Sequence, residues 1–292
     1  MNCATQTLTG IDNKEKPQRT RRIGNCSCPE VYIRKHFLLR ETPCTPWLKI
    51  KELLIMDKFK TLRDEAYEAN MEIKKNKLAI YTWGNSSAFD PDKGVFAIKP
   101  SGVDYDLLKP QSMVVIDLEG NIVEGKLKPS SDTKTHQVLY KEFSKLAGFN
   151  IRGITHTHST FAVAWAQAAK PVSVFGTTHA DHGTEEIPCT DFMNAEAVQN
   201  NYELETGNLI VQTFKKLNLD PAFQQMVLVA GHGPFTWGKN AAESVYNSTV
   251  LEEICKMAHL TLSINPETKP LPEHIIKKHW HRKHGKDAYY GQ

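Results

Sequence analysis

Two histidines two positions apart, His156 and His158, have the residue type and spacing of a metal site. They lie in residues 151–159, which we expect to form a short strand between two helical runs. Side chains at i and i+2 of a strand leave from the same face. Two imidazoles on one face can converge on a metal such as zinc, cobalt, nickel or manganese. The alternative interpretation is a pair of strand-end histidines that are hydrogen-bonded to solvent.

His232 is the candidate third ligand. It follows an apolar run at 226–230 that predicts a strand, and glycines flank it, so that no neighbouring side chain crowds the imidazole. Asp132, which follows Pro-Ser-Ser, could be a fourth ligand, a base beside the metal, or a plain helix N-cap. Three histidines with one open position are typical of a catalytic rather than a structural zinc site. His232 could instead be a surface loop histidine.

Three short segments could hold an anion. Trp83 begins a Trp-Gly-Asn run at a predicted strand end, and residues 99–102 combine an ammonium, a hydroxyl and a glycine amide in a turn. Ser130 and Ser131 lie at a predicted helix N-terminus, where free amides and the helix dipole favour phosphate. Each segment could also be ordinary turn chemistry. Together, on one rim, they would favour a phosphorylated substrate.

Polar residues elsewhere offer acid–base chemistry. Asp181 lies in a loop of small polar residues, and Tyr290 lies at the extreme C-terminus, where it needs a docking site to act because chain ends fray. Glu203 could orient a metal-bound group, and we count it with the substrate-binding residues; it could also be an exposed helix carboxylate. The basic run 277–284 is most often a solvated helix face.

Composition excludes several classes of protein. The chain is 40% hydrophobic and 24% charged, which is ordinary for a globular protein, and its net charge is +3. The basic excess lies in residues 1–55, so the remainder does not suggest a nucleic-acid partner. No apolar run approaches the roughly 20 residues that cross a bilayer, so we expect no membrane partner. Four of the six cysteines lie in residues 1–55, which is no secreted disulfide framework and favours a cytoplasmic protein.

The chain divides into two parts. Residues 1–55 show no sustained periodicity and contain several prolines, so we expect a disordered extension; residues 56–292 are expected to form a single domain. Hairpins mixed with helices favour an antiparallel or mixed sheet with helical layers over a Rossmann arrangement. Helices are predicted at 59–73, 132–146, 160–169, 208–217, 240–263 and 275–284, strands at 78–82, 151–159 and 226–230, and hairpins around the turns at 90–94 and 119–121.

The ordered motifs resemble those of the class II aldolase and adducin family, and within it the L-ribulose-5-phosphate 4-epimerases. The resemblance covers residues 57–292. It rests on Thr-Trp-Gly-Asn, Ile-Lys-Pro-Ser-Gly-Val-Asp-Tyr, Lys-Pro-Ser-Ser-Asp-Thr, Thr-His-Thr-His-Ser, Gly-Thr-Thr-His-Ala-Asp, Glu-Thr-Gly-Asn, His-Gly-Pro-Phe-Thr-Trp-Gly-Lys-Asn and Lys-His-Gly-Lys-Asp-Ala-Tyr-Tyr-Gly-Gln.

This resemblance implies a three-layer α/β/α fold with a central, mainly antiparallel sheet, and a homotetramer with sites at subunit interfaces. It implies zinc, with manganese or cobalt as alternatives, on His156, His158 and His232, and Asp132 close to the metal. Asp181 and Tyr290 would be the acid–base pair, with Tyr290 supplied by a neighbouring subunit. The residues implied to hold the substrate are Gly84, Asn85, Ser101, Gly102, Ser130 and Ser131, with Lys99 near its phosphate.

The implied reaction interconverts L-ribulose 5-phosphate and D-xylulose 5-phosphate by cleaving and re-forming the C3–C4 bond. One alternative is a class II sugar-phosphate aldolase, which releases its aldehyde; aldolases of the family tend to carry Glu where this chain has Asp132. Another is a non-catalytic, adducin-like interaction domain, which the retained histidines disfavour. Residues 182–186 replace the aromatic residues that the epimerases usually place after the acid–base aspartate.

Overall fold

The computed structural model describes residues 57–143, 151–286 and 288–289. The extension expected at residues 1–55, the end of the helix predicted at 132–146, and Tyr290 lie outside these ranges. Among the described helices, none combines the length and the apolar character that a membrane span requires.

A seven-stranded sheet forms the centre of this part of the chain, in the order β4-β3-β2-β1-β5-β7-β6. All pairings between these strands are antiparallel, which confirms the predicted sheet. The strands are β1 Asn85–Asp90, β2 Val95–Ile98, β3 Val114–Asp117, β4 Ile122–Glu124, β5 Gly153–His156, β6 Met226–Val229 and β7 Gly233–Gly238.

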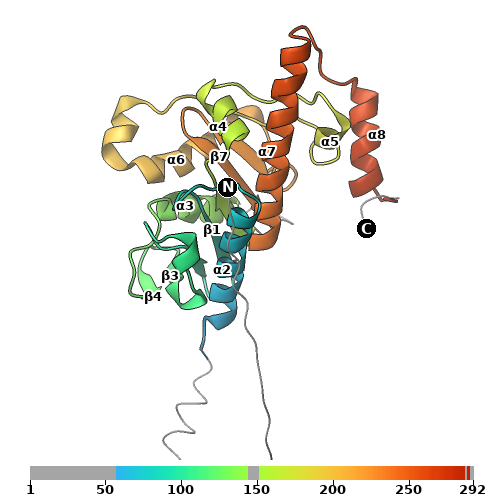
Figure 1. Cartoon of the computed structure of the whole chain (residues 1–292). Coiled ribbons are helices and arrows are strands. Elements are labelled where there is room, and N and C mark those ends of the chain that lie inside the picture. The colour runs from blue at the N-terminus through green and yellow to red at the C-terminus, as the bar shows by residue number, and fades with distance from the viewer. Residues whose placement is uncertain (1–56, 144–150, 287, 290–292) are drawn as a thin grey trace, which may run out of the picture. The chain divides into compact units, whose positions relative to one another are not determined.

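Helices cover both faces of this sheet (Figure 1). On one face α3 and α6 pack over the larger apolar cluster, and on the other α2, α4 and α7 pack over two further clusters. The three-layer α/β/α prediction is therefore confirmed. The helices are α2 Lys60–Lys75, α3 Thr133–Phe143, α4 Thr160–Gln167, α5 Thr177–Ala180, α6 Ala195–Leu217, α7 Ala241–Ile264 and α8 Glu273–His284, with short 3-10 turns at Tyr105–Leu107 and Pro110–Ser112.

Strand side chains alternate between these two apolar layers. In β2, Phe96 and Ile98 face the α3–α6 layer, whereas Val95 and Ala97 face α2. This alternation follows from the two-residue period of a strand. Trp237 of β7 is fully buried and packs against Phe143 and Phe214, at ring-centroid distances of 4.9 and 5.3 Å. Apart from the exposed edge strand β4, both faces of the sheet are thus covered by apolar side chains.

Three sequence predictions need correction. The segment 78–82 forms no strand: residues 81–82 are a turn, and Tyr81 has a positive φ of 55°, which an extended strand does not allow. Strand β7 was missed because Gly233 and Pro234 are poor strand formers. Helix α6 begins at Ala195 rather than near 208, since its polar first half gives little apolar periodicity.

The close packing of Gly153 in β5 yields a test of the fold. A Cβ at this position would overlap the backbone of Asn240 and Ala241 at the start of α7. We therefore expect Gly153→Ala to lower the free energy of unfolding by about 1–3 kcal/mol, the usual cost of overpacking. Urea unfolding of the metal-free protein measures this loss. Gly176→Ala is the matched control, because nothing lies within 4 Å of its Cβ position; equal midpoints for the two variants would contradict the packing argument.

Candidate metal centre

The three predicted histidines come together at one end of the sheet. Their ligand atoms all lie within 4.8 Å of one another. His156 ends β5, His158 lies in the loop before α4, and His232 lies in the turn between β6 and β7. The prediction of convergence is confirmed, but not by the expected route. Strand β5 stops at His156, so the loop that follows it, and not a shared strand face, directs His158 toward its partners.

Strand pairing explains the position of His232. In the β5–β7 ladder His156 lies opposite Phe235, and the two rings stack at 4.3 Å with an interplanar angle of 20°. The β6–β7 turn therefore lies beside the end of β5. The His156 and His232 rings are 4.7 Å apart, and those of His158 and His232 are 5.3 Å apart.

The environment of His156 fixes its tautomer. Its Nδ1 lies 2.9 Å from the carbonyl oxygen of Pro234. Because a carbonyl only accepts hydrogen bonds, Nδ1 carries the proton and Nε2 keeps a free lone pair. A backbone carbonyl on the distal nitrogen is the usual arrangement for a metal-binding histidine.

The other two imidazoles also suit a cation. The Nδ1 atom of His232 is buried and has no hydrogen-bond partner among the described residues. An unpaired buried nitrogen costs about 1–3 kcal/mol. Burial lowers the pKa of His232 to about 3, and burial and the neighbouring His156 lower that of His158. Neutral imidazoles are the form that binds metals, so the donor set fits a divalent ion.

Asp132 lies beside this triad rather than within it. Its Oδ2 accepts a 2.6 Å hydrogen bond from Nδ2 of Asn85. Burial raises the pKa of Asp132, but the nearby imidazoles of His156 and His136 and the bond from Asn85 outweigh this effect and lower it. The carboxylate is therefore ionised and adds negative charge next to the site. A direct bond from Asp132 to a metal stays a prediction.

The predicted Gly84 and Asn85 lie where strand β1 begins, next to the triad: Gly84 directly precedes the strand and Asn85 is its first residue. Asn85 pairs with His156 in the β1–β5 ladder. Gly84 has a φ of +79°, and a Cβ there would lie 2.9 Å from the carbonyl oxygen of His156. Only glycine meets both the left-handed backbone and this close approach. The Oδ1 atom of Asn85 is buried and lacks a partner in the described ranges.

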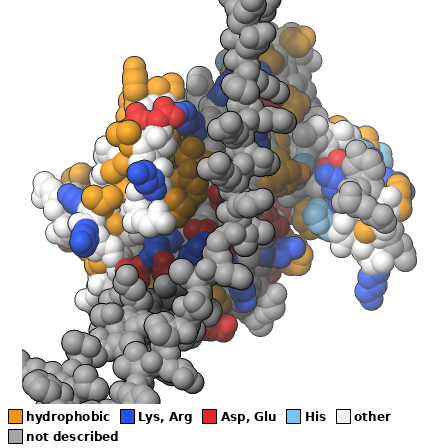
Figure 2. All heavy atoms as spheres, turned by 60° about the horizontal axis from the view of Figure 1, so that its bottom comes forward, with side chains coloured by type: hydrophobic (Ala, Val, Ile, Leu, Met, Phe, Trp, Pro, Cys, Tyr) orange, Lys and Arg blue, Asp and Glu red, His pale blue; other side chains and the backbone are white. Residues whose placement is uncertain are grey.

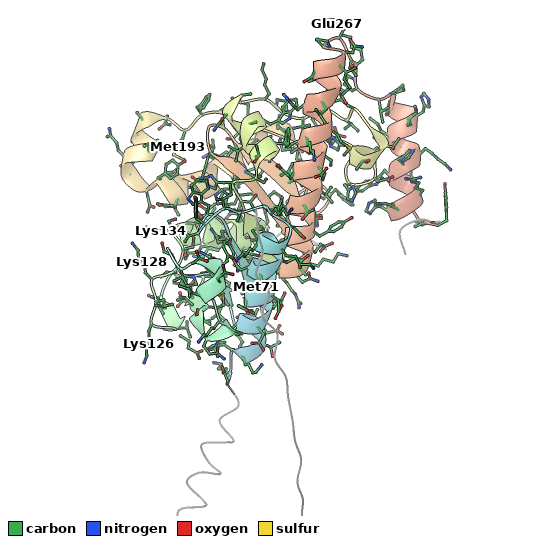
Figure 3. All side chains as sticks on the ribbon, in the orientation of Figure 1. Met71, Lys126, Lys128, Lys134, Met193 and Glu267 are labelled. Atoms are coloured by element: carbon green, nitrogen blue, oxygen red, sulfur yellow. The ribbon has the colours of Figure 1, made fainter. Side chains whose placement is uncertain are left out.

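Two of the three segments predicted to hold an anion, residues 99–102 and Ser130–Ser131, lie side by side. The Ser130 amide donates to the Lys99 carbonyl at 3.0 Å, and the Ser101 amide donates to the Lys128 carbonyl at 2.9 Å. Gly102 and Ser131 are exposed. Figure 3 shows Lys128 and Lys134 on the same side of the molecule, flanking the start of α3. These two segments therefore form one rim, and the exposed Lys128 and Lys134 are their neighbours in the sequence.

Lys99 is buried within that rim, with a relative exposure of 2%. Its Nζ donates to the carbonyl oxygen of Thr82 at 3.2 Å and lies 4.9 Å from the centre of the Tyr105 ring. Burial lowers the pKa of Lys99 to about 8, an effect that the charge of Asp104 partly opposes. The ammonium thus supports the turn before β1.

Two aromatic residues beside the triad were not among the predicted site residues. The Tyr202 ring lies 6.0 Å from that of His232, and the Trp83 ring lies 6.2 Å from that of His158. Glu203, which was predicted, accepts a 2.6 Å hydrogen bond from Thr135 through its backbone carbonyl; its role at the site stays a prediction. Trp83 was named only as the start of a segment that could hold an anion, and Tyr202 was given no role, because a single aromatic in a polar stretch has no distinguishing spacing.

Asp181 occupies a different environment. Its carboxylate accepts hydrogen bonds from Nε and Nη2 of Arg282 at 3.1 and 2.7 Å and lies 3.0 Å from Nδ1 of His279. Lys283 lies 4.0 Å away. Burial raises the pKa of Asp181, but the bonds from Arg282 and His279 outweigh it and lower the pKa. All described side-chain partners of Asp181 belong to α8, and Figure 2 shows basic and histidine side chains gathered at that end of the molecule.

Comparison with known proteins identifies the family. The family model described as Class II Aldolase and Adducin N-terminal domain matches residues 64–259. The L-ribulose-5-phosphate 4-epimerase UlaF of Salmonella paratyphi B is 45% identical over 231 residues, which cover 79% of this chain and 98% of that protein. The protein of the same name from Salmonella typhi has the same identity and coverage.

Solved structures agree on the fold. An L-fuculose 1-phosphate aldolase has a TM-score of 0.61 at 23% identity, and the match covers 75% of this chain and 94% of that one. The L-fuculose 1-phosphate aldolase from Glaciozyma antarctica PI12 has a TM-score of 0.61 at 16% identity, covering 78% and 84% of the two chains. The sequence matches and the similarity in fold agree, and the chain belongs to the class II aldolase and adducin family.

Proposed function

We propose that this chain is a metal-dependent L-ribulose-5-phosphate 4-epimerase, which interconverts L-ribulose 5-phosphate and D-xylulose 5-phosphate. The observation that carries the proposal is the convergence of three histidine ligand atoms within 4.8 Å. The 45% identity to UlaF proteins along 98% of their length supports the substrate. Zinc is the expected ion, with manganese or cobalt as alternatives, because all three donors are imidazoles.

The chemistry explains why such a site is needed. The hydrogen on C4 of the substrate is not acidic, so simple proton removal cannot invert that carbon. Cleaving the C3–C4 bond avoids this barrier: the C4 hydroxyl loses its proton, C4 becomes an aldehyde, and the electron pair stays with the three-carbon fragment. A divalent ion held by the triad would act as a Lewis acid for that negative charge. The aldehyde then turns, and the bond re-forms on its other face.

The chain's own residues would bind and orient the two halves of the substrate. We assign the phosphate to the rim formed by Ser101, Gly102, Ser130 and Ser131, because amides at the N-terminus of α3 and the exposed Lys128 and Lys134 favour an anion there. Lys99 would act from beneath this rim. Asn85 and the ionised Asp132 would orient the end of the substrate that faces the triad.

Asp181 and Tyr290 are proposed as the acid–base pair that serves the two sides of the aldehyde oxygen. The described partners of Asp181 come from α8 and not from the triad. The proposal therefore includes a homotetramer, in which residues from one chain complete the site of another. An exposed apolar groove of about 320 Å³ along α7 supports assembly; Met257, Leu260 and Ile264 line it. The proposed location is the cytoplasm, which is consistent with the free thiols of Cys189 and Cys255.

A second candidate is a sugar-phosphate aldolase, which the fold shared with L-fuculose 1-phosphate aldolases favours. Such an enzyme would release glycolaldehyde phosphate and dihydroxyacetone from L-ribulose 5-phosphate without forming D-xylulose 5-phosphate. Product analysis by phosphorus NMR separates the two reactions. A protein that neither binds a divalent ion nor turns over the substrate would point instead to an adducin-like interaction domain.

Metal removal tests the core of the proposal. We expect dialysis against a chelator to abolish D-xylulose 5-phosphate formation, and added zinc to restore it. Loss of a residue that only hydrogen-bonds a metal ligand can lower activity by up to about 100-fold. Because His232 is itself a proposed ligand, we expect His232→Ala to lower activity by more than this. Metal analysis should show less than one ion per chain in this variant. His259→Ala, on the distal part of α7, is the matched control. Full activity of a metal-free wild-type protein would contradict the proposal.

The burial of Lys99 predicts a pH effect on substrate binding. Its pKa is lowered to about 8, so the ammonium is charged below that pH and neutral above it. If this charge assists phosphate binding, the KM for L-ribulose 5-phosphate should rise as the pH increases from 7 to 9.5. Lys99→Met should show a high KM that stays flat over the same range. An equally steep rise in the variant would assign the effect to another group.

Mixing inactive variants tests the shared site. We expect Tyr290→Phe to slow epimerisation far more than it weakens metal binding, because the ring remains but the acidic proton is lost. His232→Ala lacks a metal ligand but keeps Tyr290. If chains share sites, tetramers that contain both variants should recover activity, since some sites carry an intact triad and an intact tyrosine. Light scattering verifies the assembly state, and mixed tetramers without recovered activity would show that each chain supplies its own tyrosine.

A further inference from the structure

A turn whose backbone is fixed by buried side chains lies immediately before β1. The Lys99 ammonium donates to the Thr82 carbonyl at 3.2 Å. The Tyr105 hydroxyl lies 3.1 Å from the carbonyl oxygens of both Trp83 and Gly84 and shares its one donated proton between them. Lys99 and Tyr105 are each only 2% exposed. Three successive carbonyls are thus directed into the protein and held there, although the turn itself lies at the surface.

This arrangement directs the turn's aromatic side chains outward. Tyr81 is 75% exposed and Trp83 is 51% exposed. Their rings meet edge to face at 6.0 Å and 74°. Tyr81 has a positive φ of 55°, which a bulky residue rarely adopts. A strained backbone that displays two large aromatic rings to solvent contributes nothing to the apolar core, which indicates a use outside it.

The outward ring of Trp83 lies next to the metal centre. Its centroid is 6.2 Å from that of His158, with an interplanar angle of 51°. The following residue, Gly84, packs against the backbone of His156, which fixes the distance between the turn and the triad. A second ring, that of Tyr202, lies 6.0 Å from that of His232. Two partly exposed rings therefore lie near the triad, each beside a different ligand.

We propose that Trp83 is a wall of the substrate pocket that retains the aldehyde fragment while it turns. This inference rests on the proposed epimerase function. After C3–C4 cleavage the two-carbon aldehyde is attached to the protein only through its phosphate, so it can either turn or leave. An indole face offers contact area without directional hydrogen bonds, so it favours neither face of the aldehyde. It also excludes water from the carbonyl.

The partition of the cleaved substrate measures this role. With L-ribulose 5-phosphate as the substrate, phosphorus NMR measures the ratio of released glycolaldehyde phosphate to D-xylulose 5-phosphate. In Trp83→Ala this ratio should rise about 10-fold or more, the size of effect that follows from losing one apolar contact in a pocket. Trp83→Phe, which keeps a flat ring, should show a smaller rise. Trp165→Phe, a change in α4, is the matched control and should keep the wild-type ratio.

A readout without turnover verifies the position of the indole. Bound Co²⁺ quenches nearby tryptophan emission, so titration of the metal-free protein with Co²⁺ should quench the wild type and the Trp165→Phe variant strongly. Trp83→Phe should lose most of this quenching while it binds the same amount of Co²⁺. Quenching that is unchanged in Trp83→Phe would contradict the placement of Trp83 beside the triad.

The outcomes separate this inference from the function on which it rests. A wild-type protein that forms no D-xylulose 5-phosphate overturns the proposed function and the inference together. An active Trp83→Ala with an unchanged release ratio overturns the inference alone, even if its kcat falls, because slower turnover by itself does not alter the partition. If Trp83→Ala does not fold, Trp83→Leu replaces it, because leucine keeps apolar volume but lacks the flat aromatic ring. Its release ratio is judged in the same way.

Discussion

The antiparallel pairing of β5 with β7 is the constraint on which the site depends. It sets His156 opposite Phe235 and so places the turn that carries His232 against the end of β5. The turn itself depends on Gly233, whose Cβ would lie 3.0 Å from the carbonyl of Thr157. Because the sheet is buried on both faces, its strands cannot slide without exposing apolar side chains. The register that protects the core therefore also fixes the distance between the ligands.

Some buried polar atoms near the site have no hydrogen-bond partner among the described residues. They belong to Asn85, His136 and His232, while two more such atoms, of Arg63 and His179, lie elsewhere. Each such atom costs about 1–3 kcal/mol. The apolar layers above and below the sheet must offset this cost. A cation and a polyhydroxylated substrate would provide partners for atoms of this kind, which is consistent with a binding site.

The contacts of helix α8 show why the sequence motif around Asp181 does not by itself reveal where Asp181 acts. Asp181 was selected from a polar loop, and the structure places it under Arg282 and His279 of α8. Those two residues lie about 100 positions further along the chain, and no local pattern links them to the loop. Within one chain, the contact of Asp181 with Arg282 and His279 holds α8 in place. The proposed catalytic use of Asp181 and Tyr290 depends instead on how chains assemble, which is determined by their surfaces and not by local sequence.

The sequence alone determined the residue types of the site and most of its elements. His156, His158 and His232 could be selected because a His-x-His pair, a further histidine after a predicted strand and the family resemblance together favour a metal site, and the hairpins followed from turn residues between apolar runs. Tertiary structure decided which residues surround the metal position. Trp83 and Tyr202 reach the triad only because distant strands and helices pack together. Tyr81 has a left-handed backbone, and the three carbonyls that follow it are hydrogen-bonded to the buried Lys99 and Tyr105. Such contacts join residues far apart in the chain, so periodicity and spacing carry no record of them.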